Sequence, residues 1–346
     1  MMDKVLIKKL TEAFGPSGRE DEIRALIEKE VKPYADEMTV DTLGNLIAHK
    51  KGGGKKLLLS THMDTPGFVV TEVDEKGYLM LQNVGCVTPG QPVESWSSSK
   101  ATDALTPAFV PAQTIRFQNG AKAVTYYGDA KALDKISMFD MFADLGVSGR
   151  DAARELADIG DMAVLHAPAV ELKNKLAGAY VSDRVGCAIL IDVLKNAKTD
   201  CDLYVLFAAQ GCVGSRGAGA AAFAIDPDYA VNVHAGIASD APNARQGCLK
   251  LGAGPAVEAL DRTAIVPFAV REKLKAAAES VNVPVQNDAL RPAGSETAPI
   301  QRTKKGVLTG VVSIPTRYHG ARTEMIDLSD AENAVKLLTA FINKDF

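Results

Sequence analysis

Several features that would assign a chain to a special class of protein are missing here. The 346 residues include five cysteines, an odd number without CxxC spacing, which argues against a disulfide framework or a zinc ribbon. No apolar run is long enough to span a membrane, and the charged first residues are unlike a signal peptide. A net charge of −4 without a basic stripe argues against nucleic acid as a partner. We therefore expect a reduced, cytoplasmic protein.

Strong acids and bases are also missing where an α/β protein commonly has its active site. Residues 203–209 form a continuous apolar run that predicts a strand buried on both faces. Residues 210–217, which include three glycines, predict a turn, and the Ala-rich residues 218–225 predict a buried helix. Ligands of parallel sheets bind at the carboxyl ends of strands. Gly211 and Cys212 fall at such an end, and neither is a strong acid or base.

The remaining pattern predicts a mixed α/β fold with a β-rich insertion. Between residues 68 and 166 short strands alternate with turns, and the Pro- and Ser-rich residues 85–113 predict a long loop. The flanking residues 1–67 and 167–346 alternate between buried strands and amphipathic helices, as in an α/β domain. We predict a hairpin at 38–49, strands at 56–61, 203–209, 229–234 and 310–314, and helices at 3–13, 18–31, 184–196, 271–281 and 329–342.

Polar residues stand where some of these strands end and helices begin. His62 and Asp64 follow a buried strand, and two residues apart on extended backbone they point the same way. This arrangement suits a metal-binding imidazole held by a carboxylate, although an ordinary polar strand end has the same pattern. Ser182 is expected to cap the helix at 184–196, which places Asp183 in the first turn of that helix.

Five ordered motifs resemble those of one family of peptidases. They occupy residues 62–68, 182–188, 210–218, 313–318 with Glu324, and 332–338. On these motifs the chain resembles the tetrahedral, dodecameric metallo-aminopeptidases, which include glutamyl and deblocking aminopeptidases. The resemblance implies a zinc-peptidase-like mixed sheet flanked by helices and interrupted by a β-rich dimerisation domain. It also implies a homo-oligomer, with dimers assembled into a dodecamer that would act on peptides.

The resemblance further implies two zinc or cobalt ions held side by side. His62 matches the first ligand, Asp64 the carboxylate that orients it, and Asp183 the ligand that bridges the two ions. The other functional positions are replaced. Gly211 stands in place of the general-base Glu, Cys212 in place of a Glu ligand, Asn232 in place of an Asp ligand, and Gly320 in place of a late His.

These replacements leave three hypotheses. Two neighbouring dications need anionic ligands, of which Asp183 alone remains, so the first hypothesis is a family member without peptidase activity whose metal binding is weak, single or absent. The second is an active aminopeptidase with one zinc ion in a rebuilt site. Its ligands would be His62, Asp183, Cys212 and a re-aimed His234 or His319. The third is a nucleophilic pair of Cys212 and a histidine, for which no orienting third residue is identifiable.

Overall fold

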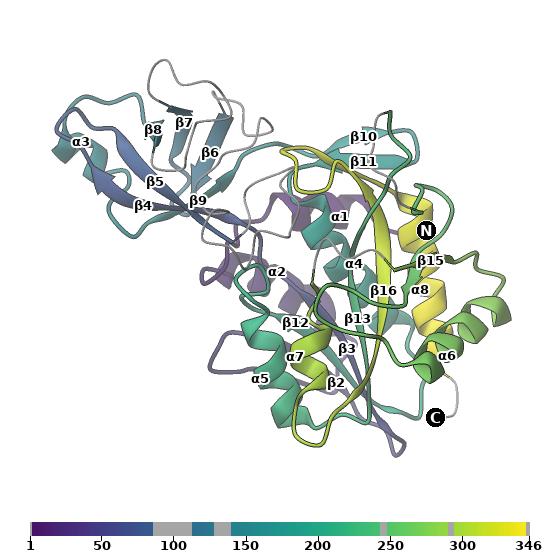
Figure 1. Ribbon diagram of the computed structural model, residues 1–346. Helices are drawn as coiled ribbons and strands as arrows, with labels where there is room; N and C mark the ends of the chain where they lie inside the picture. Colours follow the sequence, from purple (N-terminus) through teal and green to yellow (C-terminus); the bar gives the residue numbers. More distant parts are fainter. Residues whose placement is uncertain (1, 86–112, 128–139, 243–247, 290–293, 344–346) are drawn as a thin grey trace.

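The computed structural model describes residues 2–85, 113–127, 140–242, 248–289 and 294–343 (Figure 1). These residues form a large mixed sheet with helices on both faces and a smaller β-barrel beside it. This architecture confirms the predicted fold class. The predicted Pro- and Ser-rich loop lies almost entirely outside the described residues, so its conformation stays a prediction.

Four parallel strands form the centre of the large sheet. They are, in spatial order, β12 (Asp202–Ala208), β3 (Lys56–His62), β13 (Tyr229–Ile237) and β16 (Leu308–Arg317). Helices cover both faces of these strands, which explains why the strands appear in the sequence as continuous apolar runs. The carboxyl ends of parallel strands meet at one edge of a sheet, and the residues of the candidate site lie at that edge.

Antiparallel strands extend the sheet on both sides. β2 (Leu46–Lys50) pairs with β12 and carries β1 (Glu37–Val40), which forms the predicted hairpin with it. On the other side β17 (Glu324–Asp327) pairs with β16 and with β11 (Lys175–Gly178). The remaining strands of this sheet are β10 (Val170–Leu172), β14 (Ala256–Glu258) and β15 (Gln286–Asp288).

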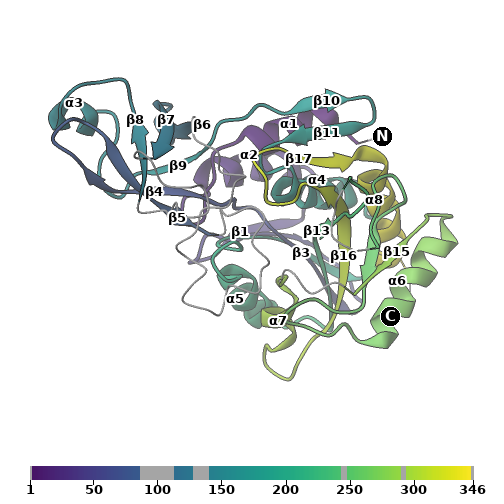
Figure 2. The ribbon, with the colours of Figure 1, turned by 45° about the horizontal axis from the view of Figure 1, so that its top comes forward.

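Helices cover the two faces of the sheet in different ways (Figure 2). Their bounds are α1 (Lys4–Glu12), α2 (Asp21–Val31), α4 (Val181–Asn196), α5 (Arg216–Ile225), α6 (Phe268–Ser280), α7 (Thr297–Gln301) and α8 (Leu328–Ile342). On one face α4 is buried almost all round, with α1, α2 and α8 packed about it and α6 beside α8. On the other face α5 and α7 approach the sheet, α5 through small alanine side chains. No helix in the described part of the chain is long and apolar enough to cross a membrane.

The start of α4 differs from the sequence prediction. Ser182 does not cap this helix, because α4 begins at Val181, directly after Tyr180 in the left-handed conformation with φ of 60°. The backbone N–H of Ser182 instead donates to the buried carboxylate of Glu324 at 3.0 Å. Asp183 lies in the first turn of the helix, as expected, so the edge of the sheet still carries this acid.

The β-rich segment forms a closed barrel to one side of the large sheet (Figure 1). Its strands are β4 (Gly67–Val73), β5 (Leu79–Val84), β6 (Gln113–Phe117), β7 (Lys122–Tyr127), β8 (Met141–Asp144) and β9 (Met162–Leu165), in the order β4-β5-β8-β7-β6-β9. The barrel has its own core around Ile115 and Phe117, which also takes in Phe14 and Tyr180 from the α/β part. The exact limits of two domains, and a role of the barrel in dimerisation, stay predictions.

Candidate metal centre

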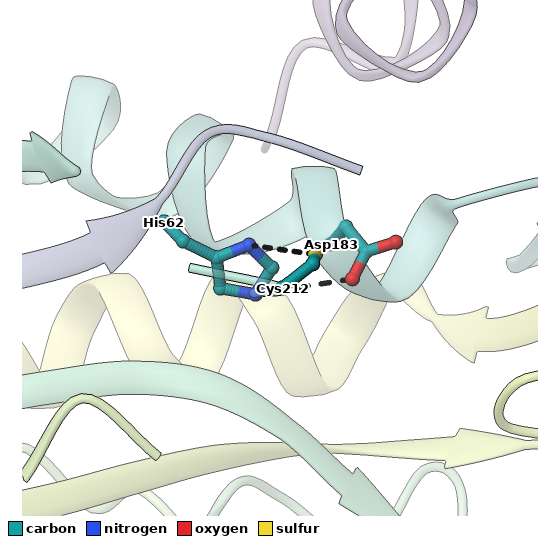
Figure 3. A group of neighbouring side chains, drawn as sticks. All are labelled: His62, Asp183 and Cys212. Atoms are coloured by element: carbon teal, nitrogen blue, oxygen red, sulfur yellow. Dashed lines mark hydrogen bonds and ion pairs between the residues drawn. The ribbon is translucent and has the colours of Figure 1, made fainter. Parts of the chain in front are cut away.

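Three of the candidate side chains meet at the carboxyl edge of the sheet (Figure 3). His62 is the last residue of β3, Asp183 lies in the first turn of α4, and Cys212 lies in the turn after β12. One ligand atom of each lies within 4.8 Å of the other two. Among the described residues no other group of three His, Cys, Asp or Glu side chains meets this criterion. We call these residues the three-residue group.

Asp64 holds the turn after β12 in place. Its fully buried carboxylate accepts hydrogen bonds from the backbone N–H groups of Gly211, at 2.7 Å, and Cys212, at 2.9 Å, and from the hydroxyl of Ser17. Burial alone would raise the pKa of Asp64, but His62 and these hydrogen bonds outweigh burial and lower it. Asp64 is therefore ionised, and it orients both the imidazole and the turn.

His62 lies between two carboxyl groups. Its Nδ1 is 3.4 Å from Asp64 Oδ1 and 3.1 Å from the carbonyl oxygen of Asp64, and its Nε2 is 3.8 Å from Asp183 Oδ1. Burial lowers the pKa of His62, but the hydrogen bond to Asp64 and the charges of both acids outweigh burial and raise it to about 10. An imidazole held by a carboxylate through one nitrogen is a common arrangement for a metal ligand.

The environment of Asp183 and Cys212 disfavours negative charge. Burial, with help from Glu324, raises the pKa of Asp183 to about 7, although the charge of His62 acts to lower it. Burial, then the carboxylates of Asp64 and Asp183, raise the pKa of Cys212 well above its usual range. Cys212 is therefore a thiol when no metal ion binds it, and its Sγ lies 3.9 Å from His62 Nδ1. These properties argue against a nucleophilic Cys212.

Gly211 leaves no room for a side chain at the position expected of the general base. A Cβ atom at Gly211 would lie 2.3 Å from Cβ and 2.7 Å from Cγ of His62, and 3.0 Å from Asp64 Oδ1. Interiors are packed too densely to absorb such an overlap without movement. Any larger residue at this position would therefore displace His62 or the turn.

Asn232 is bonded to a buried acid that the sequence analysis did not identify. Its Nδ2 donates to the carbonyl and hydroxyl oxygens of Ser60 and, at 2.9 Å, to Glu296 Oε2. Glu296 directly precedes α7 and is only 3% exposed. Burial raises the pKa of Glu296 to about 7, although the charge of His62 acts to lower it. Nothing in the local sequence marks Glu296, because only folding brings the start of α7 next to β13.

The other candidate residues lie outside the three-residue group. His234 Nε2 is 2.9 Å from Oε1 of the buried Glu258. His319 Nδ1 is 3.5 Å from Glu324 Oε1, which also accepts the backbone N–H of Gly320 at 2.6 Å. Neither histidine is placed as a fourth ligand in this conformation. The sequence analysis placed Glu324 in a family motif without giving it a role, and it did not identify Glu258 as a neighbour of the site.

Backbone strain marks the borders of the site. Tyr180 before α4, Gln210 after β12 and Tyr318 after β16 have left-handed φ angles of 60°, 57° and 57°. Such angles are uncommon for residues other than glycine, and in proteins they concentrate at functional sites. The turns that frame the three-residue group thus have a defined, strained geometry.

The residues present fit one metal ion and do not fit two. A nitrogen, an oxygen and a sulfur ligand within 4.8 Å of one another suit one tetrahedral zinc ion with an open fourth position. A second ion would need further anionic ligands to offset the repulsion between two dications. Positions 211 and 320 have no side chain, and the amide of Asn232 is neutral and bonded to Glu296.

Comparison with known proteins assigns most of this chain to one family. Residues 44–337 match the family model described as M42 glutamyl aminopeptidase. The chain belongs to this family. It is 37% identical to a presumed aminopeptidase of Acetivibrio thermocellus, over 97% of both chains. The resemblance found in the sequence motifs is thereby confirmed.

Solved structures of aminopeptidases share the fold of this family member. The aminopeptidase APDkam598 from the archaeon Desulfurococcus kamchatkensis has a TM-score of 0.88 and 29% identity, over 98% of this chain and 94% of that one. The TET1 peptidase of Pyrococcus horikoshii has a TM-score of 0.84 and 25% identity, over 98% of this chain and 99% of that one. That peptidase can assemble into a tetrahedron or a large octahedral shell.

Proposed function

We propose that this member of the glutamyl aminopeptidase family lacks peptidase activity. The observation that carries the proposal is the packing around Gly211, where the family resemblance expects the general base. A side chain there would overlap His62, and residues 210–217 contain no carboxylate that could accept a proton from water. Loss of a general base alone reduces rates by about 10²–10⁴-fold. The chain would then act as a binding or scaffold member of its family.

At most one divalent ion is expected at this site. His62, Asp183 and Cys212 would hold it, and zinc or cobalt are the metals that the family resemblance implies. A bound ion would supply Lewis-acid chemistry to a carbonyl group placed at its open position. Metal binding requires deprotonated ligands, and the raised pKa of the Cys212 thiol opposes this, so we expect weak binding at neutral pH.

A second candidate function is an active aminopeptidase with a single metal ion. The close approach of the three-residue group favours it, because three ligands and one open position are typical of catalytic zinc. Glu296 favours it as well, because a buried carboxylate with a pKa of about 7 is suited to accept a proton at neutral pH. In this case the N-termini of peptides would be the substrates.

Hydrolysis assays separate the two candidate functions. Protein purified without chelator should hydrolyse glutamyl, lysyl and leucyl anilides no faster than an Asp183→Asn control, with or without added zinc or cobalt. The second candidate would be established by a different result. Hydrolysis would then require Asp183, disappear with a chelator and return with one metal ion per chain. The Asp183→Asn control also reveals contaminating peptidases, because it is purified in the same way.

We also propose that the chain forms a homo-oligomer, with dimers joined through the barrel and assembled into a dodecamer. Support comes from the TET1 peptidase of Pyrococcus horikoshii, which can assemble into a tetrahedron or a large octahedral shell and matches this chain over nearly its full length. Val124 and Tyr126 on β7 are each 46% exposed and give the barrel an apolar outer surface suited to such a contact.

A further inference from the structure

A buried carboxylate outside all five sequence motifs lies beside the candidate metal centre. Glu296 Oε2 accepts a hydrogen bond from Asn232 Nδ2 at 2.9 Å. Glu296 Oε1 and Asn232 Oδ1 have no hydrogen-bond partner within the described part of the chain. Buried ionisable groups persist in proteins when a specific partner compensates for their loss of water. The amide of Asn232 is one such partner for Glu296, and a hydrogen bond with the side chain of Ser60 also acts to lower the pKa of this carboxyl group.

The surroundings of Asn232 fix the orientation of its amide. Nδ2 faces the carbonyl oxygen of Ser60 at 3.2 Å, the hydroxyl of Ser60 at 3.0 Å and the carboxylate of Glu296. A carboxylate at position 232 has no hydrogen to donate to any of these acceptors. It would also face Glu296 across the same short distance, as a second negative charge in a buried place.

The family resemblance gives position 232 a particular meaning. It implies an Asp ligand at this position, whose charge a neighbouring dication would balance. In this chain Asn232 is 1% exposed and neutral, and its amide N–H donates to the adjacent carboxylate of Glu296. The amide of Asn232 thus stabilises a buried negative charge, which is the role that the family resemblance gives to a metal ion at this position.

We propose that the Asn232–Glu296 hydrogen bond takes the place of the second metal ion and makes the folded site independent of metal binding. Asn232 acts by holding the carboxylate of Glu296 and does not belong to the three-residue group. An acid at position 232 is then tolerated only when Glu296 is neutral or when a cation is supplied. The inference rests on the proposed function, because that proposal treats position 232 as a replaced metal-ligand position. The hydrogen bond between Asn232 and Glu296 does not depend on peptidase activity.

A double-mutant cycle tests this proposal in the full-length protein. Thermal unfolding is followed in chelator at about pH 8, which is above the pKa of about 7 of the buried Glu296. Asn232→Asp should lower the midpoint by at least about 3 °C, and Glu296→Gln alone should change it by less than about 1 °C, because glutamine still accepts the hydrogen bond. The double variant should recover most of the loss, because the introduced glutamine amide then donates to the introduced carboxylate. Where Asn232→Asp does not fold, recovery of folded protein in the double variant is the readout.

Two controls show whether the effect is specific. Glu258→Gln removes an equally buried acid that is bonded to His234, so adding it to Asn232→Asp should bring no recovery. Added zinc or cobalt should raise the midpoint of Asn232→Asp, and chelator should leave that of the unmodified protein unchanged. An Asn232→Asp variant as stable as the unmodified protein in chelator, or a double variant that recovers nothing, would overturn the proposal. Peptidase activity in the unmodified protein would instead refute the proposed function.

Discussion

In the proposed function, the chemistry of the site depends on the side chain that Gly211 lacks. The imidazole of His62 packs so close to the Gly211 backbone that even a methyl group would overlap it, at 2.3 Å from Cβ. The same imidazole is held by Asp64, whose carboxylate also binds the backbone N–H of Gly211. The proposed loss of the base and the position of His62 are therefore linked through one set of contacts.

Replacing Gly211 by alanine should destabilise the protein. We expect the free energy of unfolding to fall by about 1–3 kcal/mol, the usual effect of forcing an extra methyl group into a packed interior. Gly53→Ala is the matched control, because a Cβ at Gly53 meets no atom within 4 Å and should change stability by less than about 0.5 kcal/mol. Urea unfolding measures both variants. Equal stability of Gly211→Ala and the unmodified protein would show that the turn can move.

Asp183→Asn should change how stability depends on pH. Burial raises the pKa of Asp183 from 3.8 to about 7 in the folded protein, so the folded state binds more protons than the unfolded state between these values. The contribution of Asp183 to the free energy of unfolding is then fully present below about pH 4 and is lost as pH rises toward about 7. The free energy of unfolding of the metal-free variant should rise by on the order of 4 kcal/mol relative to that of the unmodified protein between about pH 4 and pH 7. Urea unfolding in chelator at a series of pH values measures this difference. If the free energies of unfolding of the two proteins changed in parallel with pH, the prediction would be wrong.

The sequence identified the residues of the site that belong to contiguous motifs and missed those that do not. His62, Asp64 and Asp183 lie in segments whose strand and helix boundaries are visible in the sequence. Glu296 and Glu258 lie in ordinary-looking segments, and only the pairing of β14 with β16 and the packing of α7 bring them to the site. Their role depends on contacts between distant segments, which local patterns do not encode.

At the scale of elements, burial on both faces made the central strands predictable. The apolar runs of β3, β12 and β16 are long and continuous because helices cover both of their faces. The short barrel strands β7 and β8 lack such a signal and were not predicted. The start of α4 was misplaced because the site forces Tyr180 into a left-handed conformation and gives the N–H of Ser182 to Glu324, contacts that propensity rules do not anticipate.

The cap of α8 provides a test at this scale. Asp327 caps this helix. Its carboxylate accepts a hydrogen bond from the Ser329 N–H and pairs with Lys175 at 2.6 Å. Asp327→Ala should lower the free energy of unfolding by about 1–2 kcal/mol, because both the cap and the ion pair are lost. Asp327→Asn, which keeps a capping oxygen, should lose less. Thermal unfolding of the two variants gives their order, and equal losses would contradict the capping role.

The whole molecule combines the fold of a peptidase family with a centre that we propose is altered. The chain shares its fold with a solved aminopeptidase, and the family resemblance implies that Gly211, Cys212, Asn232 and Gly320 replace functional residues. Residues that build a fold and residues that carry a reaction are separate sets, so one can change while the other remains. The centre is packed and hydrogen-bonded, as the contacts of Asp64 and Asn232 show.

Assembly is a prediction about the whole molecule. We expect a particle of about twelve chains, each of 36.6 kDa, with dimers as the building unit, because the TET1 peptidase of Pyrococcus horikoshii, which matches this chain over 98% of its length, can assemble into a tetrahedron or a large octahedral shell. Light scattering coupled to size-exclusion chromatography at micromolar concentration measures the mass. A monomer under these conditions would contradict the prediction, and a stable dimer would retain the building unit without the shell.

Metal content and peptidase activity, measured on one preparation, test the central claim most directly. Protein purified without chelator is analysed for zinc and cobalt and assayed with aminoacyl anilides beside the Asp183→Asn variant. The account predicts at most one metal ion per chain and no hydrolysis above that of the variant, because the base is absent and the ligands suit one ion. Two tightly bound metal ions per chain together with rapid, chelator-sensitive hydrolysis would contradict it.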